Sequence, residues 1–313
     1  MNPTIYIGCD AHKSACTFCA IDEDGKTVWQ GERPTTRDGF DNVRDKFSGY
    51  EIKLVLEALG FVWKIVDMLS ELEIETYVCN PNENPLIGNS RKKTDPEDAR
   101  KLAELLRMGY LRCIYIPTKE QREFRIIARE RNSMVRTRTR FINQKKSASY
   151  DHQVERRDRL LDVVDGEIRL LDREISDETA REDVQLLMST PGLAEYGASL
   201  IAGEICTIDR FQVSRQYLAY CGLVPSVRQS GEKTRMGATR KDSNSRLRWI
   251  YVQAAWHAVR IDPVMCKYFT RKAHDKGKRK AIVIIAKKLA ARNYWMLKKK
   301  QTYQEVSAKK NVG

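Results

Sequence analysis

The chain has 313 residues, of which 42% are hydrophobic and 31% are charged, and this composition excludes a largely disordered chain. Its length leaves room for two domains. Lysine and arginine total 56 against 42 acidic residues, and the net charge of +14 indicates a polyanionic partner, with nucleic acid the first candidate. A basic protein without such a partner is the alternative.

Alternating apolar and polar segments up to about residue 115 predict an α/β domain with a mixed sheet. Three strands in hairpin order come first, and helices then alternate with strands. The predicted elements are strands at 4–9, 15–21 and 27–30, a helix at 36–47, a strand at 52–56, a helix at 61–72 and a strand at 74–79.

The stretch Lys92–Arg100 places three carboxylates within four residues of a basic chain. Thr94 or Asp95 suits a helix N-cap, and acidic residues suit the positive end of a helix, so the stretch reads as an ordinary helix start. Alternatively, Asp95 and Asp98 share a helix face and hold a divalent metal, whereas Glu97 lies on another face.

Two further carboxylates follow predicted buried strands, Asp10 after the first and Glu57 after the fourth. If these two meet Asp95 and Asp98, like charges at close range raise one another's pKa, and a bound divalent cation removes that penalty. Carboxylate oxygens favour Mg²⁺ or Mn²⁺, and paired metals serve phosphodiester displacement. The pattern therefore indicates nuclease or strand-transfer chemistry.

The segment 119–149 is strongly basic, with ten lysines or arginines against three glutamates. An apolar seam with spacings of four and three follows it, which is typical of a coiled coil. We expect two long helices, or one helix broken near residues 147–151. The basic face either contacts nucleic acid or is simply solvated. The seam consists of Leu160, Val164, Ile168, Leu171 and Ile175.

The C-terminal half is predicted to be mainly helical, and it opens with a helix-hairpin-helix pattern at 184–205 around Pro191-Gly192. Such a hairpin suits a phosphate, although an ordinary helical hairpin has the same pattern. A polar, turn-rich block at 226–237 contains Ser230, which either binds a phosphate or acts as a nucleophile. The cations expected to contact nucleic acid here are Arg228, Lys233, Arg235, Arg240, Lys241, Arg246 and Arg248.

Eight cysteines lie mostly in apolar runs, so we expect free thiols, no zinc site and a cytoplasmic protein. The N-terminus lacks a signal-peptide pattern, and no apolar run approaches the ~18–20 residues that span a membrane.

Several motifs together resemble the DEDD insertion-sequence transposases, a group that includes Piv-type DNA invertases and transposases guided by a bridge RNA. The N-terminal half resembles their RuvC-like (ribonuclease-H-like) domain, and the C-terminal half their transposase domain. The matching strings are Ile7-Gly8-Cys9-Asp10, Leu56–Gly60, Lys93–Arg100, Thr190–Leu193, Tyr220–Pro225, Gln229-Ser230-Gly231 and Arg246-Leu247-Arg248.

This resemblance implies that Asp10, Glu57, Asp95 and Asp98 bind Mg²⁺ or Mn²⁺, and that Ser230 attacks a DNA phosphate to give a 5′-phosphoseryl intermediate. It also implies donor and target DNA, a bridge RNA, and dimers that pair into a tetramer. The metals and the serine come from different domains. The implied segments are a catalytic domain at 1–117, long helices at 118–182 for dimer and RNA contacts, a transposase domain at 183–300 and a tail at 301–313.

The sequence departs from the family pattern before Arg246, where Ser243 replaces a glycine. Ser243 and Ser245 are therefore competing hydroxyls for the role of Ser230. The alternatives are a site-specific invertase, a structure-specific nuclease that hydrolyses DNA with water, and an architectural nucleic-acid-binding protein.

Overall fold

A computed structural model describes residues 2–80, 94–230, 233–239 and 243–308, and the chain divides into two compact units, Met1–Ile116 and Pro117–Gly313. The predicted motif residues 81–93, 231–232 and 240–242, which include Arg240 and Lys241, lie outside the described residues. The further division of the second unit at 182/183 stays a prediction.

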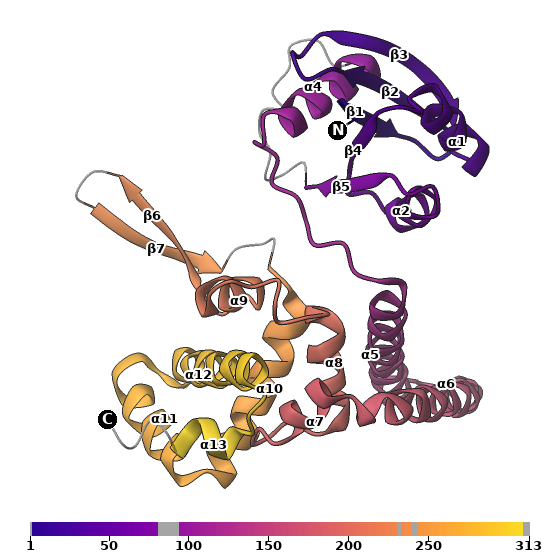
Figure 1. The fold of residues 1–313 in the computed structure, drawn as a ribbon. Coiled ribbons are helices and arrows are strands. Elements are labelled where there is room, and N and C mark those ends of the chain that lie inside the picture. The colour runs from indigo at the N-terminus through magenta and orange to yellow at the C-terminus, as the bar shows by residue number, and fades with distance from the viewer. Residues whose placement is uncertain (1, 81–93, 231–232, 240–242, 309–313) are drawn as a thin grey trace. The chain divides into compact units, whose positions relative to one another are not determined.

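The first unit is built on a five-stranded mixed sheet in the order β3-β2-β1-β4-β5 (Figure 1). β1 pairs antiparallel with β2 and parallel with β4, which pairs parallel with β5. This order confirms the predicted RuvC-like mixed sheet. The elements are β1 (Thr4–Ala11), β2 (Ala15–Ile21), β3 (Thr27–Pro34), α1 (Arg37–Lys46), β4 (Glu51–Glu57), α2 (Val62–Glu71), β5 (Glu75–Cys79) and α4 (Asp95–Arg107).

The two faces of this sheet carry different helices. In β1, Ile5, Ile7 and Cys9 belong to the core that contains the buried residues of α1 and α2. Tyr6 belongs to a separate cluster with Ala99 and Ala103 of α4. Since side chains alternate along a strand, Asp10 lies on the face that α4 covers.

A glycine lets α4 lie close to this face. A Cβ atom on Gly8 would overlap the carbonyl oxygen of Ala99 and lie 2.8 Å from the backbone nitrogen of Ala103. These are backbone atoms, which cannot swing away as a flexible side chain can. The packing distance of α4 is therefore set by the absence of a side chain at position 8.

The second unit begins with a long helical hairpin, α5 (Lys119–Lys146) and α6 (Asp151–Asp177), which confirms the predicted pair of helices. Val164, Leu171 and Ile175 of the predicted seam are buried, whereas Leu160 is 37% exposed. Three ion pairs join the helices at intervals of seven residues, the period of a heptad-like contact between two antiparallel helices. The pairs are Arg131–Asp172 (2.8 Å), Arg138–Asp165 (2.6 Å) and Lys145–Asp158.

The rest of the second unit is helical apart from one β-hairpin. The polar block predicted as turns forms two antiparallel strands, β6 and β7, so the prediction of irregular structure there was wrong. In the segment predicted as a tail, Tyr303 is buried in a short helix. The elements are α7 (Glu182–Met188), α8 (Glu195–Ile205), α9 (Ser214–Tyr220), β6 (Pro225–Ser230), β7 (Lys233–Thr239), α10 (Ser245–Ile261), α11 (Pro263–Lys276), α12 (Lys278–Lys299) and α13 (Tyr303–Ala308).

Helices α7 and α8 form the expected helical hairpin. Gly192 in their connection has a φ of +84°, which favours glycine, and a Cβ atom there would lie 2.8 Å from His257 Cβ. The hairpin therefore packs closely on α10.

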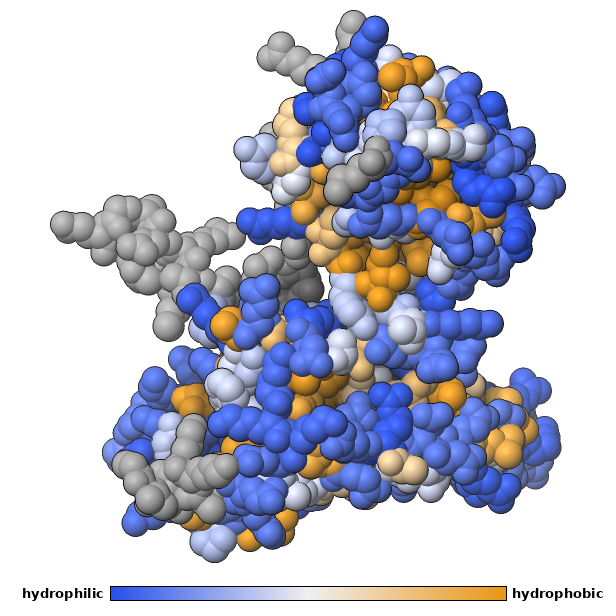
Figure 2. All heavy atoms as spheres, viewed as in Figure 1, coloured by the Kyte–Doolittle hydropathy of each residue, from blue (hydrophilic) through white to orange (hydrophobic). Residues whose placement is uncertain are grey.

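Hydrophilic residues cover most of the visible surface of each unit, with hydrophobic residues showing between them (Figure 2). Among the helices described, none combines the length and the apolar character needed to cross a bilayer. All eight cysteines are free thiols, and six of them are buried.

Replacing Gly8 by alanine is expected to lower the free energy of unfolding of the first unit by about 2–3 kcal/mol, because the added methyl group forces α4 off the sheet. Chemical denaturation followed by circular dichroism measures this. Gly49→Ala is the control, since a Cβ atom at Gly49 meets no atom within 4 Å. Equal stability of the two variants would contradict the close packing of α4.

Candidate functional site

The ends of β1 and β4 bring two of the predicted carboxylates to one edge of the sheet. The last paired residues of these strands are Cys9 and Leu56, and Asp10 and Glu57 are the next residues along each. Glu57 shares its face with Val55, which packs against Leu102 and Leu105 of α4. Asp10 and Glu57 therefore lie on neighbouring strands under the same helix.

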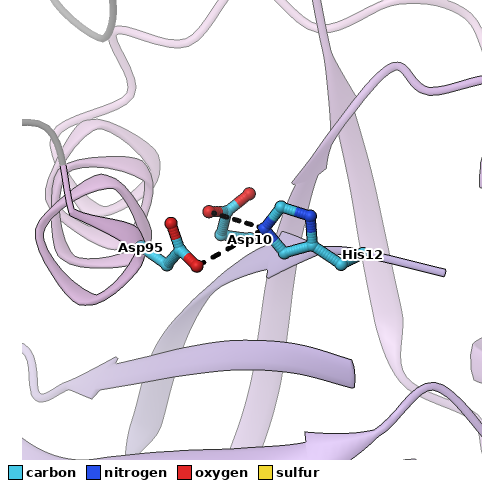
Figure 3. A group of neighbouring side chains, drawn as sticks. All are labelled: Asp10, His12 and Asp95. Atoms are coloured by element: carbon cyan, nitrogen blue, oxygen red, sulfur yellow. Dashed lines mark ion pairs between the residues drawn. The ribbon is translucent and has the colours of Figure 1, made fainter. Parts of the chain in front are cut away.

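Asp95, the first residue of α4, approaches Asp10 through a histidine that the sequence analysis did not select. His12 Nε2 lies 3.7 Å from Asp10 Oδ2 and 3.5 Å from Asp95 Oδ2 (Figure 3). One ligand atom from each of the three residues lies within 4.8 Å of the other two. The Asp10 side chain is 22% exposed and that of Asp95 is 59% exposed, so the group is open to solvent on the Asp95 side.

The other two predicted ligands lie outside this close group. Asp98 is buried, and its carboxylate accepts a hydrogen bond of 3.3 Å from Lys101 Nζ. Glu57 lies beside Cys79, whose thiol pKa is raised to about 12, first by burial and then by the charge of Glu57. The convergence of all four carboxylates on one point stays a prediction.

The start of α4 differs in detail from the expected cap. Thr94 occupies the N-cap position with an extended backbone, but its side chain makes no capping hydrogen bond. Asp95, Glu97 and Asp98 occupy the first turn, where the partial positive charge of the helix end stabilises carboxylates. The first-turn acids thus have the electrostatic role that the sequence indicated, without side-chain capping by Thr94.

His12 had a weak signal in the sequence. It follows Asp10 by two residues, and positions two apart at the end of a strand lie on the same face. Two carboxylates and an imidazole are a donor set that suits a divalent cation, and a cation there relieves the repulsion between Asp10 and Asp95. The residues at this edge therefore fit a metal ion.

In the second unit, Ser230 is the last residue of β6, and the turn residues after it lie outside the described part of the chain. It pairs with Lys233, and Arg228 pairs with Arg235. The backbone register therefore places Ser230 and three cationic residues in the same part of the ladder.

The two remaining predicted contacts, Arg246 and Arg248, lie in the first turn of α10. The side chain of Asn244 caps this helix by accepting hydrogen bonds from the backbone nitrogens of Arg246 (3.0 Å) and Leu247 (3.1 Å). The competing hydroxyl of Ser243 lies 2.6 Å from the position of a Cβ atom on Gly222. The cap thus fixes the start of α10, and with it the backbone positions of Arg246 and Arg248.

A buried carboxylate anchors this cap. Glu204 of α8 has no exposed surface, and Asn244 Nδ2 donates to its Oε2 at 2.7 Å. Arg129 of α5 binds both of its oxygens at 2.7 Å. Burial raises the pKa of Glu204, but the hydrogen bonds and charges of Arg129 and Asn244 lower it by more, so the pKa lies below its ordinary value.

Two family models match the chain. The DEDD transposase model matches residues 7–148, and the model described as transposase IS116/IS110/IS902 family matches residues 184–270. The chain belongs to the IS110/IS1111 family of transposases. It is therefore an enzyme that cleaves and joins DNA, and the DEDD domain implies a divalent metal, which the residues around Asp10 and Asp95 fit.

Curated relatives support this assignment along most of the chain. A putative transposase of Sinorhizobium fredii is 27% identical over 286 residues, which cover 80% of this transposase and 71% of the relative. The transposase for insertion sequence element IS1111A of Coxiella burnetii is 24% identical over 336 aligned positions, which cover 95% of this chain and 91% of the relative.

Glu204→Gln is expected to lower the free energy of unfolding at pH 7 by about 2–4 kcal/mol, because Arg129 loses its buried counter-charge. The folded-state pKa of Glu204 is depressed below the unfolded-state value near 4.5. The contribution of its ionised form to stability is therefore complete above that value and is lost as the pH falls through the folded-state pKa. The stability difference between wild type and variant should therefore shrink in acid.

Urea denaturation at a series of pH values measures this difference. Asp209→Asn is the control, because the Asp209 carboxylate pairs with Lys298 but is 80% exposed, and such surface pairs contribute at most about 1 kcal/mol. A Glu204→Gln effect as small as the control's would contradict an anchoring role.

Proposed function

We propose that this transposase cuts and rejoins the DNA of its insertion sequence with Mg²⁺ or Mn²⁺ held by Asp10, Glu57, Asp95 and Asp98, and with Ser230 as the nucleophile. The observation that carries the proposal is the meeting of Asp10 and Asp95, 85 residues apart in the chain, with His12 at one edge of the sheet. A divalent cation would relieve the repulsion between two carboxylates held this close.

At the first unit's site, the protein supplies oriented oxygen ligands. Asp10 extends from a strand whose other face is buried, and Asp95 and Asp98 occupy the first turn of a helix held on the sheet. His12 positions the two nearer carboxylates from between them. A bound divalent cation would supply Lewis-acid stabilisation of the charge that develops on a phosphodiester.

At the second unit's site, Ser230 Oγ would form a bond to the phosphorus while the bond to the 3′ oxygen breaks. The serine proton leaves, and the departing 3′ oxygen takes up a proton and becomes a hydroxyl. A 3′ hydroxyl of the partner strand then attacks the phosphoserine and regenerates Ser230. Arg228 and Arg235 are paired in the backbone ladder of this hairpin, and a cationic residue type at these positions suits the negative charge of a phosphate.

The proposed partners are donor and target DNA, a bridge RNA, and further copies of the chain in a dimer that pairs into a tetramer, in the cytoplasm. Helix α6 supports the dimer, because it leaves three apolar side chains exposed with helical spacing: Leu160, Val163 and Leu170. Arg246 and Arg248, together with the hairpin cations and with Arg240 and Lys241 outside the described residues, would contact nucleic acid.

Addition of Mn²⁺ is expected to raise the melting temperature by several degrees, since a ligand at 100 times its Kd stabilises the folded state by about 2.7 kcal/mol. Asp10→Asn and Asp95→Asn should abolish this rise, and His12→Ala should reduce it. Differential scanning calorimetry of the full chain measures the shift. Glu97→Gln should keep the full shift, and a loss as large as that of Asp10→Asn would contradict the assignment of Asp95 and Asp98 over Glu97.

Ser230→Ala is expected to abolish the covalent protein–DNA adduct and to lower strand cleavage by on the order of 1000-fold or more, because no other group replaces the nucleophile. Denaturing gels of DNA labelled on the 5′-phosphate side of the cut, with the copurifying RNA present, measure both. Ser243→Ala and Ser245→Ala should keep the adduct. Cleavage that survives in Ser230→Ala would indicate a nuclease that uses water instead.

A further inference from the structure

A groove of about 410 Å³ lies between α10 and the start of α12 in the second unit. Its volume is within the range of small-ligand sites. The apolar lining comes from the contact between the two helices: Val252, Trp256, Ile282 and Val283. The rest of the lining is polar or aromatic: Ser245, Arg248, Trp249 and Arg279.

The charge of this groove is positive. Arg248 and Arg279 both line it and are exposed, and none of the described residues that line it is acidic. No ion pair joins either arginine to another residue in the described part of the chain. The groove is therefore complementary to an anionic ligand.

The start of α12 adds to this positive charge, although cations at a helix N-terminus destabilise the helix. Lys278, Arg279 and Lys280 fill the first turn, where the partial positive charge of a helix end disfavours cations. Between residues 267 and 300, the sequence contains thirteen lysines and arginines and one acidic residue, Asp275. Such a cluster at a helix N-terminus is relieved when phosphate oxygens bind there.

The aromatic side chains of the groove are unequally covered. Trp256 packs edge-on against Phe269, with ring centroids 5.6 Å apart. Trp249, about two turns closer to the start of α10 than Trp256, is 40% exposed. An exposed indole beside cations is the combination with which proteins stack unpaired bases while holding the adjoining phosphates.

We propose that this groove binds an unpaired nucleotide of single-stranded DNA, with its base stacked on Trp249 and its phosphates beside Arg248 and Arg279. DNA is the nucleic acid that the family's reaction cuts, and cutting frees strands whose bases are unpaired. The groove is separate from Asp10 and from Ser230 in the sequence, and the proposal does not depend on the role of either residue.

Fluorescence anisotropy measures the affinity of the full chain for a 12-nucleotide oligo-dT. EDTA is present, so that metal-dependent binding is excluded. Trp249→Ala should weaken binding about 5- to 100-fold, and Trp249→Phe should restore most of it. Trp295→Ala is the matched control, because Trp295 is 43% exposed and has Lys299 5.3 Å from its ring centroid but does not line the groove. Arg279→Gln should lower the slope of log Kd against log salt by about 0.7.

Three outcomes would overturn the proposal. Equal losses in Trp249→Ala and Trp295→Ala would mean general charge binding without a stacking site. A loss confined to an oligo-rU probe would assign the groove to RNA. A change of oligomeric state in Trp249→Ala by light scattering, with oligo-dT affinity unchanged, would assign it to a protein interface.

Discussion

The contact of α4 with the central strand is the constraint on which the first unit's chemistry depends. Gly8 has no side chain, and Ala99 and Ala103 are the residues of α4 that lie over it, so the helix and strand backbones come together. This contact lies four residues into α4 and two residues before Asp10. The first turn of the helix is thereby brought to the edge where the strand ends, and Asp95 meets Asp10 there. A bulkier residue at position 8 would move the carboxylates apart without touching either of them.

The cations behind the net charge of +14 have different roles in the structure, and several of those in one basic segment serve the fold. In the 119–149 segment, several cations pair with acidic side chains, among them Arg129, Arg131, Arg138 and Lys145. These charges hold α5 to α6 and to α8, so they serve the fold of the second unit. Within the described residues, Arg248 and Arg279 form no such ion pairs, and the proposed contact with a polyanion rests on the cations at the start of α10 and of α12.

Elements with a buried apolar face could be predicted from the sequence, because the apolar pattern marks them. Elements built from polar residues could not, because they have no such pattern. All five strands of the mixed sheet were anticipated, because runs such as Leu54–Leu56 are apolar and buried on both faces of a covered sheet. The β6–β7 hairpin was read as turns, because its ladder joins polar strands through the backbone. His12 was missed for a related reason. Its proximity to Asp95 depends on where α4 begins, and the sequence showed only its spacing from Asp10.

Glu204 shows how the second unit fixes its basic surface on rigid elements. A fully buried carboxylate is stable only when its hydrogen-bonding capacity is met, and here Arg129 and Asn244 meet it from two other helices. Because Asn244 also caps α10, the same carboxylate fixes the start of that helix. The backbone positions of Arg246, Arg248 and Trp249 follow from it. Strand transfer needs a phosphate to be held still while one bond forms and another breaks. A site on a helix start anchored in this way meets that requirement better than one on a free loop.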